Sequence, residues 1–329
     1  MRSLSGNRLG AEGAAALAPA LAANGALTKL SLAWNKLEEE GTKAICEALK
    51  QNKTLKELDL SGHNNIGGEA GAKHVADMLH VNGGLKELNI AGNSIKDEGI
   101  TAICNAVQGN KEGKLAKLNV AGNNMSPVGA TAVAAMVAVT GALTVTNLLQ
   151  NNLDVESAKM LAEVAKQKGI SLCGIQRDQT TADFSNQDLK PPDAILLASD
   201  LSQAGVTGGL TSIDLSKNRL CGIWETERDG QQGTYTAEGI TAIADALRVN
   251  GALTRVDVRS NNIAGDGAEQ LAAAVLGNLK IEMFNKIPIK EMRADSFTEL
   301  DLKGKGVGVE GVMVVAGLIP AMSALTKVR

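Results

Sequence analysis

The chain has 329 residues, of which 44% are hydrophobic and only 2% aromatic, so aliphatic side chains must supply its buried core. Its 33 basic and 36 acidic residues leave a net charge of −3, which argues against nucleic-acid binding driven by overall positive charge. No run of about 18 uncharged apolar residues occurs, so we expect no membrane insertion. The N-terminal sequence MRSLSGNRLG lacks the apolar core of a signal peptide, and we therefore expect a cytoplasmic protein.

A strand motif of the form LxxLxLxxNxL recurs along the chain. A partial copy opens the sequence, and the first full copy carries Leu27, Leu30, Leu32, Asn35 and Leu37. Strong copies begin at Leu85, Leu115, Leu210 and Leu253, and the copy at Leu55 carries two extra residues in SGHNNI. Weaker copies begin at Leu143, Gln179 and Phe297. In the first half of the chain the motif asparagine returns every 28 or 30 residues, at Asn7, Asn35, Asn65, Asn93, Asn123 and Asn151. This spacing predicts a repeated structural unit.

Each repeat predicts a short strand, a turn and a helix. Alternate leucines such as Leu30 and Leu32 share one face of the strand and are expected to point inward. An Ala- and Leu-rich stretch with helical spacing follows, as in GTKAICEALKQN. One such unit cannot bury its apolar layer alone, so neighbouring units must stack. We expect the asparagines to form a ladder whose amides satisfy turn backbone groups between neighbouring coils.

This unit resembles the leucine-rich repeat, and its 28-residue form resembles the ribonuclease-inhibitor type. The resemblance covers nearly the whole chain. It implies an α/β leucine-rich-repeat solenoid, or horseshoe, with a parallel β-sheet on the concave face and helices on the convex face. We therefore expect a single solenoid over residues 1–329, with about ten coils.

Three insertions break the period, near residues 169–178, 221–236 and 279–293. The first carries GISLCGIQRD, and the second is a polar, glycine-containing loop with Trp224 and Tyr235. The third, LKIEMFNKIPIKEMR, is apolar enough to predict a degenerate coil without a helix. Insertions in solenoids often carry recognition, although simple loop growth explains them equally well.

Both ends of the sequence fall inside a strand motif, and neither shows the polar cap that a free solenoid needs. We therefore expect a chain truncated mid-repeat at both ends, or one whose ends are covered by partners in a larger assembly.

The cysteines and histidines do not predict a reactive or metal-binding site. Cys46, Cys104, Cys173 and Cys221 form no CxxC pair, and we expect buried thiols in a reducing compartment. The three histidines show no HxxxH or HExxH spacing. No nucleophile–base grouping or phosphate loop is evident. We therefore expect no metal, no cofactor and no catalysis.

The strand residues between the inward leucines are expected to form columns on the concave face, large enough for a protein partner. The second half of one column is acidic, which is either a binding surface or a solvated face neutralised by nearby arginines. Trp34 is either an anchor for a partner or packs on its neighbouring coil. The candidate protein-binding residues are Lys29, Trp34, Asp59, Glu87, Lys117, Asp214, Trp224, Tyr235, Arg255, Asp257, Arg259 and Asp301.

Two functions follow from the resemblance. The first is a non-catalytic scaffold that binds a protein partner through the concave face and the insertion loops, as in the repeat regions of NOD-like receptors. The second is a GTPase activator similar to the Ran GTPase-activating proteins, for which Arg8 and Arg219 are the candidate loop arginines. Members of that family typically carry an acidic tail after the repeats, and the given sequence has none, which truncation would also explain.

Overall fold

The computed structural model describes residues 2–226, 228 and 230–329, and it comprises two compact units. Unit 1 is Met1–Gly174 and unit 2 is Ile175–Arg329. The sequence-based expectation of a single solenoid over residues 1–329 stays a prediction.

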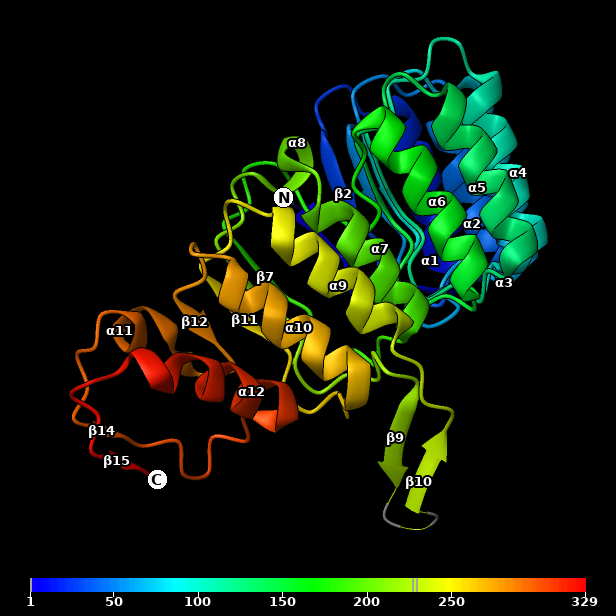
Figure 1. Cartoon of the computed structure of the whole chain (residues 1–329). Helices are drawn as coiled ribbons and strands as arrows, with labels where there is room; N and C mark the ends of the chain where they lie inside the picture. The colour runs from blue at the N-terminus through cyan, green and yellow to red at the C-terminus, as the bar shows by residue number, and fades with distance from the viewer. Residues whose placement is uncertain (1, 227, 229) are drawn as a thin grey trace. The chain divides into compact units, whose positions relative to one another are not determined.

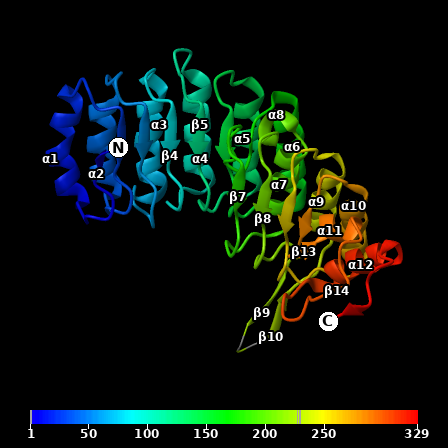
Figure 2. The same ribbon diagram turned by 90° about the vertical axis from the view of Figure 1, so that its left-hand side faces the viewer.

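In unit 1, parallel strands form one six-stranded sheet in chain order. The strands are β1 (Arg2–Ser3), β2 (Lys29–Ser31), β3 (Glu57–Asp59), β4 (Glu87–Asn89), β5 (Lys117–Asn119) and β6 (Val145–Asn147). The helices that follow them are α1 (Gly10–Ala23), α2 (Glu38–Leu49), α3 (Gly68–Val81), α4 (Lys96–Gly109), α5 (Pro127–Val139) and α6 (Val155–Lys168). Figures 1 and 2 show these helices side by side along one side of the sheet.

The motif leucines form the core of unit 1, as predicted. Leu30, Leu58, Leu88 and Leu118 lie in register on neighbouring strands, and each is at most 4% exposed. Each coil therefore contributes one thin aliphatic layer that its neighbour covers, which explains why the core needs so few aromatic rings.

The predicted asparagine ladder is also present. Asn35, Asn65, Asn93 and Asn123 are at most 1% exposed. The side-chain oxygen of each accepts a backbone N–H from the preceding coil, as from Asn35 to Asn65 (2.9 Å) and from Asn93 to Asn123 (2.8 Å). Their amide nitrogens donate to strand carbonyls of their own and the preceding coil. We call this set the strand-turn ladder.

A second asparagine ladder, which the sequence analysis missed, lies where the helices end. Asn52, Asn82 and Asn110 each donate from their amide nitrogen to two backbone carbonyls of the preceding coil. The side-chain oxygens accept backbone N–H groups two or three residues further along. We call this set the helix-end ladder. Its signal was already in the sequence, because Asn24, Asn52, Asn82 and Asn110 also recur every 28 or 30 residues.

Unit 2 repeats the same architecture with more interruptions. Its main sheet has the order β13-β12-β11-β8-β7, in which only β13 is antiparallel to its neighbour. Its strands are β7 (Thr181–Asp183), β8 (Ser212–Asp214), β11 (Arg255–Asp257), β12 (Met283–Phe284) and β13 (Ile287–Pro288). Two smaller pairs are β9 (Ile223–Thr226) with β10 (Gly230–Gly233), and β14 (Glu299–Leu300) with β15 (Lys327–Val328).

The helices of unit 2 include the long repeat helices and three short segments. They are α7 (Pro191–Leu201), α8 (Ala204–Thr207), α9 (Glu238–Val249), α10 (Gly265–Gly277), α11 (Ile289–Arg293), α12 (Gly308–Leu318) and the 3₁₀ turn η1 (Ile319–Ala321). In each unit, parallel strands alternate with helices, which confirms the predicted α/β solenoid fold.

The three insertions take different forms. Ser171 in the first bridges in parallel to Val145 of β6. The second forms the antiparallel β9–β10 hairpin, whose residues Glu227 and Asp229 lie outside the described residues. The third was expected to lack a helix, and this prediction was wrong. It contains the five-residue α11, which begins directly after Pro288 and buries Ile289 and Met292, three residues apart on one helical face.

Candidate protein-binding surfaces

The strand face of unit 1 carries charges that pair between neighbouring coils. Lys29 on β2 lies 2.6 Å from Glu57 on β3, and Lys117 on β5 lies 2.8 Å from Glu87 on β4. The parallel register places these residues directly opposite each other. The hydrogen bond from Lys29 to Glu57 raises the pKa of the Lys29 ammonium. This part of the strand face is therefore nearly neutral, with its charges held in place.

Asp59 is also engaged by its neighbours. Its carboxylate accepts hydrogen bonds from the Ser31 hydroxyl (3.0 Å) and from the hydroxyl and backbone N–H of Ser61. The candidate residues Lys29, Asp59, Glu87 and Lys117 thus all lie on one sheet in unit 1.

Trp34 lies at the end of this strand face, just past β2. Its side chain is 60% exposed, yet its ring stacks on that of His63, with 6.5 Å between centroids and 7° between planes. The stack depends on Gly62, because a Cβ atom there would lie 2.8 Å from the Trp34 backbone nitrogen. Trp34 therefore packs on its neighbouring coil and still presents a large apolar surface to solvent. The predicted packing on the neighbouring coil is present, and the role of Trp34 as an anchor for a partner stays a prediction.

In unit 2, three aspartates line up across the main sheet. The register of β7, β8 and β11 aligns Asp183, Asp214 and Asp257. Hydrogen bonds from Ser185 lower the pKa of Asp183. Asp301 was expected to continue this column, but it follows β14, which pairs with β15 in a separate sheet. The strand pairing therefore does not extend the column to Asp301.

Arginines lie beside the acidic column. The Arg259 guanidinium makes a two-pronged contact with Asp257 at 2.7–3.0 Å, and it also donates to the Lys305 carbonyl at 2.7 Å. Both charged side chains are only 18% exposed, and the hydrogen bond to Asp257 raises the pKa of Arg259. Arg255 on β11 is exposed. One aspartate of the column is thus neutralised within its own coil.

The second insertion brings Trp224 against a turn arginine. The Arg219 guanidinium lies over the Trp224 ring, 4.3 Å from its centroid, and pairs with Asp188. A cavity of about 400 Å³ lies here, lined by Asn186, Asp188, Lys217, Asn218, Arg219, Trp224, Ser260 and Asn262. Tyr235 is 38% exposed and does not line this cavity, and its hydroxyl donates to the Ala264 carbonyl. The structure therefore brings Trp224 together with Arg219, which the sequence had placed in an unrelated role.

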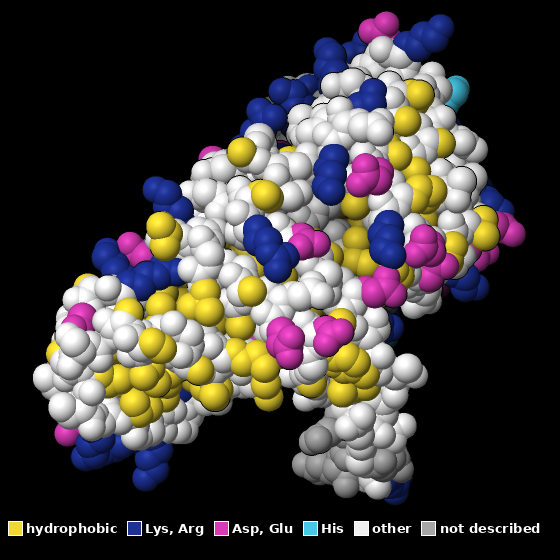
Figure 3. Space-filling model, in the orientation of Figure 1, with side chains coloured by type: hydrophobic (Ala, Val, Ile, Leu, Met, Phe, Trp, Pro, Cys, Tyr) yellow, Lys and Arg dark blue, Asp and Glu magenta, His cyan; other side chains and the backbone are white. Residues whose placement is uncertain are grey.

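An apolar patch lies over α12. Figure 3 shows hydrophobic side chains gathered on this part of unit 2. Val309, Val312 and Ile319 are 51%, 59% and 38% exposed. None of these residues was among the sequence-predicted candidates.

The four cysteines have the buried environment that the sequence predicts. All four thiols are free and buried, and burial raises the pKa values of Cys46, Cys104 and Cys221 to about 12. These three thiols are therefore protonated at neutral pH and poorly nucleophilic. Among the described residues, no group of three or more His, Cys, Asp or Glu side chains could hold a metal ion. Within the same residues, no helix has the length and apolarity to cross a membrane.

Comparison with known proteins finds leucine-rich repeats in the sequence. The leucine-rich-repeat family model matches residues 3–18, 26–46, 51–73, 85–104, 114–134 and 252–272. No curated protein matches the sequence significantly.

Several solved structures resemble the chain at low identity. A leucine-rich-repeat-containing protein, LegL7 from Legionella pneumophila, is 17% identical, with 98% of this chain and 90% of that chain covered and a TM-score of 0.45. The Rad7 and Elc1 complex in yeast gives 16% identity, 96% and 77% coverage, and a TM-score of 0.38. Actin-binding site 2 of leiomodin-1 gives 18% identity, 39% and 75% coverage, and a TM-score of 0.35. The six matched stretches, together with the strand–turn–helix coils described above, show that the chain contains leucine-rich repeats.

Proposed function

We propose that this protein is a non-catalytic scaffold of the ribonuclease-inhibitor-like type, which binds a protein partner through its strand faces and insertion loops. The observation that carries the proposal is Trp34, which is 60% exposed at the end of an ordered strand face. Tryptophan is enriched among residues that dominate binding energy at interfaces. The stack on His63 holds the ring in one position, so little side-chain entropy is lost when a partner covers it.

The charges on the same face support a partner that covers several coils. The pairs Lys29–Glu57 and Glu87–Lys117 hold their side chains across the sheet. Such a surface offers hydrogen-bonding groups around an aromatic anchor without a large net charge to desolvate. The further contacts that we propose in unit 2 are Asp214, Arg255, Asp257 and Arg259 on or beside the main sheet, Asp301 beyond it, Trp224 on β9 and Tyr235 just after β10. Free buried cysteines fit a reducing, cytoplasmic compartment.

The environment of Arg219 favours the scaffold over a GTPase activator. An activating arginine must extend toward the phosphates of the bound nucleotide. Arg219 instead pairs with Asp188 and stacks on Trp224, so its charge is already engaged.

The test is quantitative affinity capture with the full chain, the Trp34→Ala variant and the Val128→Ala variant. Val128 is a matched control, because it is 68% exposed on helix α5 of the same unit. We expect a protein that is captured by the full chain and by Val128→Ala, and is depleted at least about tenfold with Trp34→Ala. A set of captured proteins that is the same for all three chains, or empty for all three, would overturn the proposal.

A further inference from the structure

The helix-end ladder of unit 1 is interrupted at one coil. Its spacing places the next member after Asn110 at position 140, which is threonine. The Thr140 hydroxyl donates back to the Met136 carbonyl, at the end of its own helix α5. The Thr140 side chain therefore makes none of the bonds that the amides of the preceding ladder members make.

The missing side chain leaves identifiable backbone groups. By analogy with Asn82, which donates to the carbonyls of Leu49 and Asn52, an asparagine at 140 would donate to those of Val107 and Asn110. Its oxygen would accept the N–H groups of Ala142 and Leu143, as Asn82 accepts those of Gly84 and Leu85.

These groups have few other partners. Among the described residues, neither the Ala142 N–H nor the Leu143 N–H finds an acceptor, and the Val107 carbonyl finds no donor. The Asn110 carbonyl accepts one bond, from the Gly113 N–H, and a carbonyl oxygen has a second lone pair.

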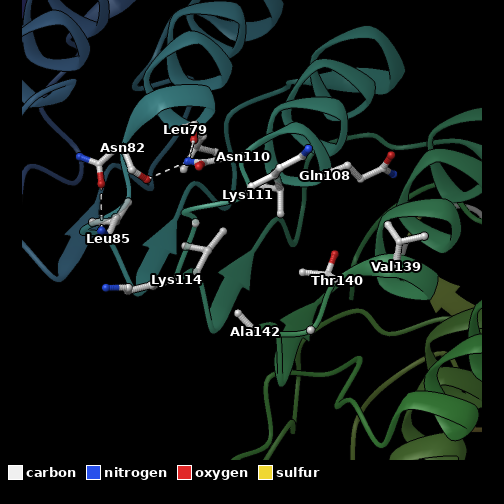
Figure 4. A pocket seen from close by; sticks show the side chains of 14 residues that line it. Leu79, Asn82, Leu85, Gln108, Asn110, Lys111, Lys114, Val139, Thr140 and Ala142 are labelled. Carbon is white, nitrogen blue, oxygen red and sulfur yellow. Dashed lines mark hydrogen bonds between the residues drawn. The ribbon is translucent and has the colours of Figure 1, made fainter.

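A cavity of about 330 Å³ lies at this interruption, open to solvent. Figure 4 shows its wall, formed by the C-terminal ends of α3, α4 and α5 and the loops that follow them. It is lined by Leu79, Asn82, Leu85, Val107, Gln108, Asn110, Lys111, Gly113, Lys114, Leu115, Val139, Thr140, Gly141 and Ala142. The cavity thus combines apolar walls with the two acceptors and the Ala142 donor.

We propose that this cavity is a binding site for a primary carboxamide, the group at the end of an asparagine or glutamine side chain. A carboxamide carries one acceptor oxygen beside two N–H donors. Its donors match the carbonyls of Val107 and Asn110, and its oxygen matches the N–H groups of Ala142 and Leu143. The ligand would repeat, from outside the chain, the bonds that Asn52, Asn82 and Asn110 make from within it.

The same backbone groups favour an amide over either charged group. A carboxylate can pair with Lys111 and Lys114, which line the cavity, but it has no donor for the Val107 and Asn110 carbonyls and would lie near the negative end of helix α4. An ammonium has donors but no acceptor for the Ala142 and Leu143 N–H groups. The apolar side chains of Leu79 and Val139 suit the aliphatic part of an amide side chain rather than a second charge.

The test measures binding of small amides by backbone amide NMR shifts in the full chain. Acetamide offers both donor and acceptor, whereas N,N-dimethylacetamide keeps the acceptor and lacks the donors. We expect acetamide to shift the Ala142 and Leu143 resonances in a saturable way, and N,N-dimethylacetamide to bind at least about tenfold more weakly. Equal responses to the two amides, or none to either, would overturn the proposal.

Two variants and one further probe sharpen the result. Thr140→Asn should fill the site, raise Tm and abolish the acetamide response. Thr131→Asn is the matched control, because it makes the same change at an exposed position of helix α5 that does not line the cavity, and it should leave the response intact. An unchanged response in Thr140→Asn contradicts the proposal. Tighter binding of N-acetyl-asparagine N′-methylamide than of acetamide would identify a protein side chain as the source of the amide, and equal binding would identify a free small amide.

Discussion

The strand faces of the two units use charge in different ways. In unit 1, opposite charges meet across neighbouring strands, as in Lys29–Glu57. On β7, β8 and β11 of unit 2, like charges are aligned instead, and Arg259 neutralises Asp257 from within the same coil. Like charges opposite each other destabilise a sheet. When a repeat places an aspartate at the same position of successive coils, the negative charges lie next to each other across the strands. A basic residue in a neighbouring column, such as Arg259, must then neutralise them.

The two units also differ in the bonds that their buried asparagines make. In unit 1 the strand-turn ladder satisfies the turns with one residue type that is repeated at every coil. In unit 2 the same bonds recur at Asn218 and Asn261, whereas Asn285 donates to the Val307 carbonyl and to the buried carboxyl group of Glu310. Four substitutions test these differences, from the largest expected effect to the smallest.

Removing a ladder amide from the middle of unit 1 should have the largest effect. Asn93→Ala deletes the acceptor for the Ile66 N–H and the donor to the Leu60 and Ile90 carbonyls, all of them buried. We expect a loss of about 3 kcal/mol in the free energy of unfolding, measured by urea denaturation. Asn7→Ala, at the exposed first rung, is the control and should cost much less. Equal losses at the two rungs would contradict the ladder account.

Breaking the charge compensation in unit 2 should come next. Arg259→Ala leaves Asp257 aligned with Asp214 and removes the donor to the Lys305 carbonyl. We expect a loss of about 2 kcal/mol by the same measurement, since this pair is largely shielded from solvent. Lys29→Ala is the comparison in unit 1. Its side chain is 49% exposed, so no measurable loss is expected, and a loss as large as that of Arg259→Ala would remove the distinction between the units.

One substitution in unit 1, at a position that departs from the repeat, should raise the free energy of unfolding. Thr146 replaces the inward leucine on β6, and its hydroxyl is buried without a hydrogen-bond partner among the described residues. Thr146→Val keeps the shape and removes the unsatisfied group, so we expect a gain of about 1 kcal/mol. Thr144→Val is the control, because the Thr144 hydroxyl donates to the Ala116 carbonyl. A loss of stability in Thr146→Val would show that the hydroxyl is satisfied after all.

The smallest effect is expected at Glu310 and depends on pH. Burial is the main cause that raises the pKa of this carboxyl above its ordinary value of 4.5. A raised pKa favours the neutral form in the folded state, so its contribution to stability is present below pH 4.5 and is lost as the pH rises through the folded-state pKa. Glu310→Gln keeps an acceptor for Asn285 and cannot ionise. Its Tm should exceed that of the unchanged protein at pH 7, and the difference should shrink toward acidic pH. A difference that does not vary with pH would contradict this explanation.

Sequence reasoning succeeded where a residue recurs and failed where it occurs once. Leu30, Leu88 and Asn93 were predictable because several coils impose the same packing at the same position. The helix-end ladder had the same periodicity and could have been found by the same argument. Some contacts depend instead on one local geometry, as do the stack of Trp34 on His63 and the contact of Arg219 with Trp224. The pairing of β14 with β15 follows the 28-residue spacing of the repeat, but the separation of this pair from the main sheet, which ended the acidic column, was not predictable from it.

The most direct test of the scaffold proposal uses the fluorescence of Trp34 in the presence of a protein captured in a Trp34-dependent way. The chain has two tryptophans, so a Trp224→Phe variant reports on Trp34 alone. A partner that covers the exposed ring should shift its emission to shorter wavelength and saturate at the affinity of the complex, and Trp34→Phe should lack this response. An emission spectrum of Trp224→Phe that does not change while the complex forms would contradict the proposal.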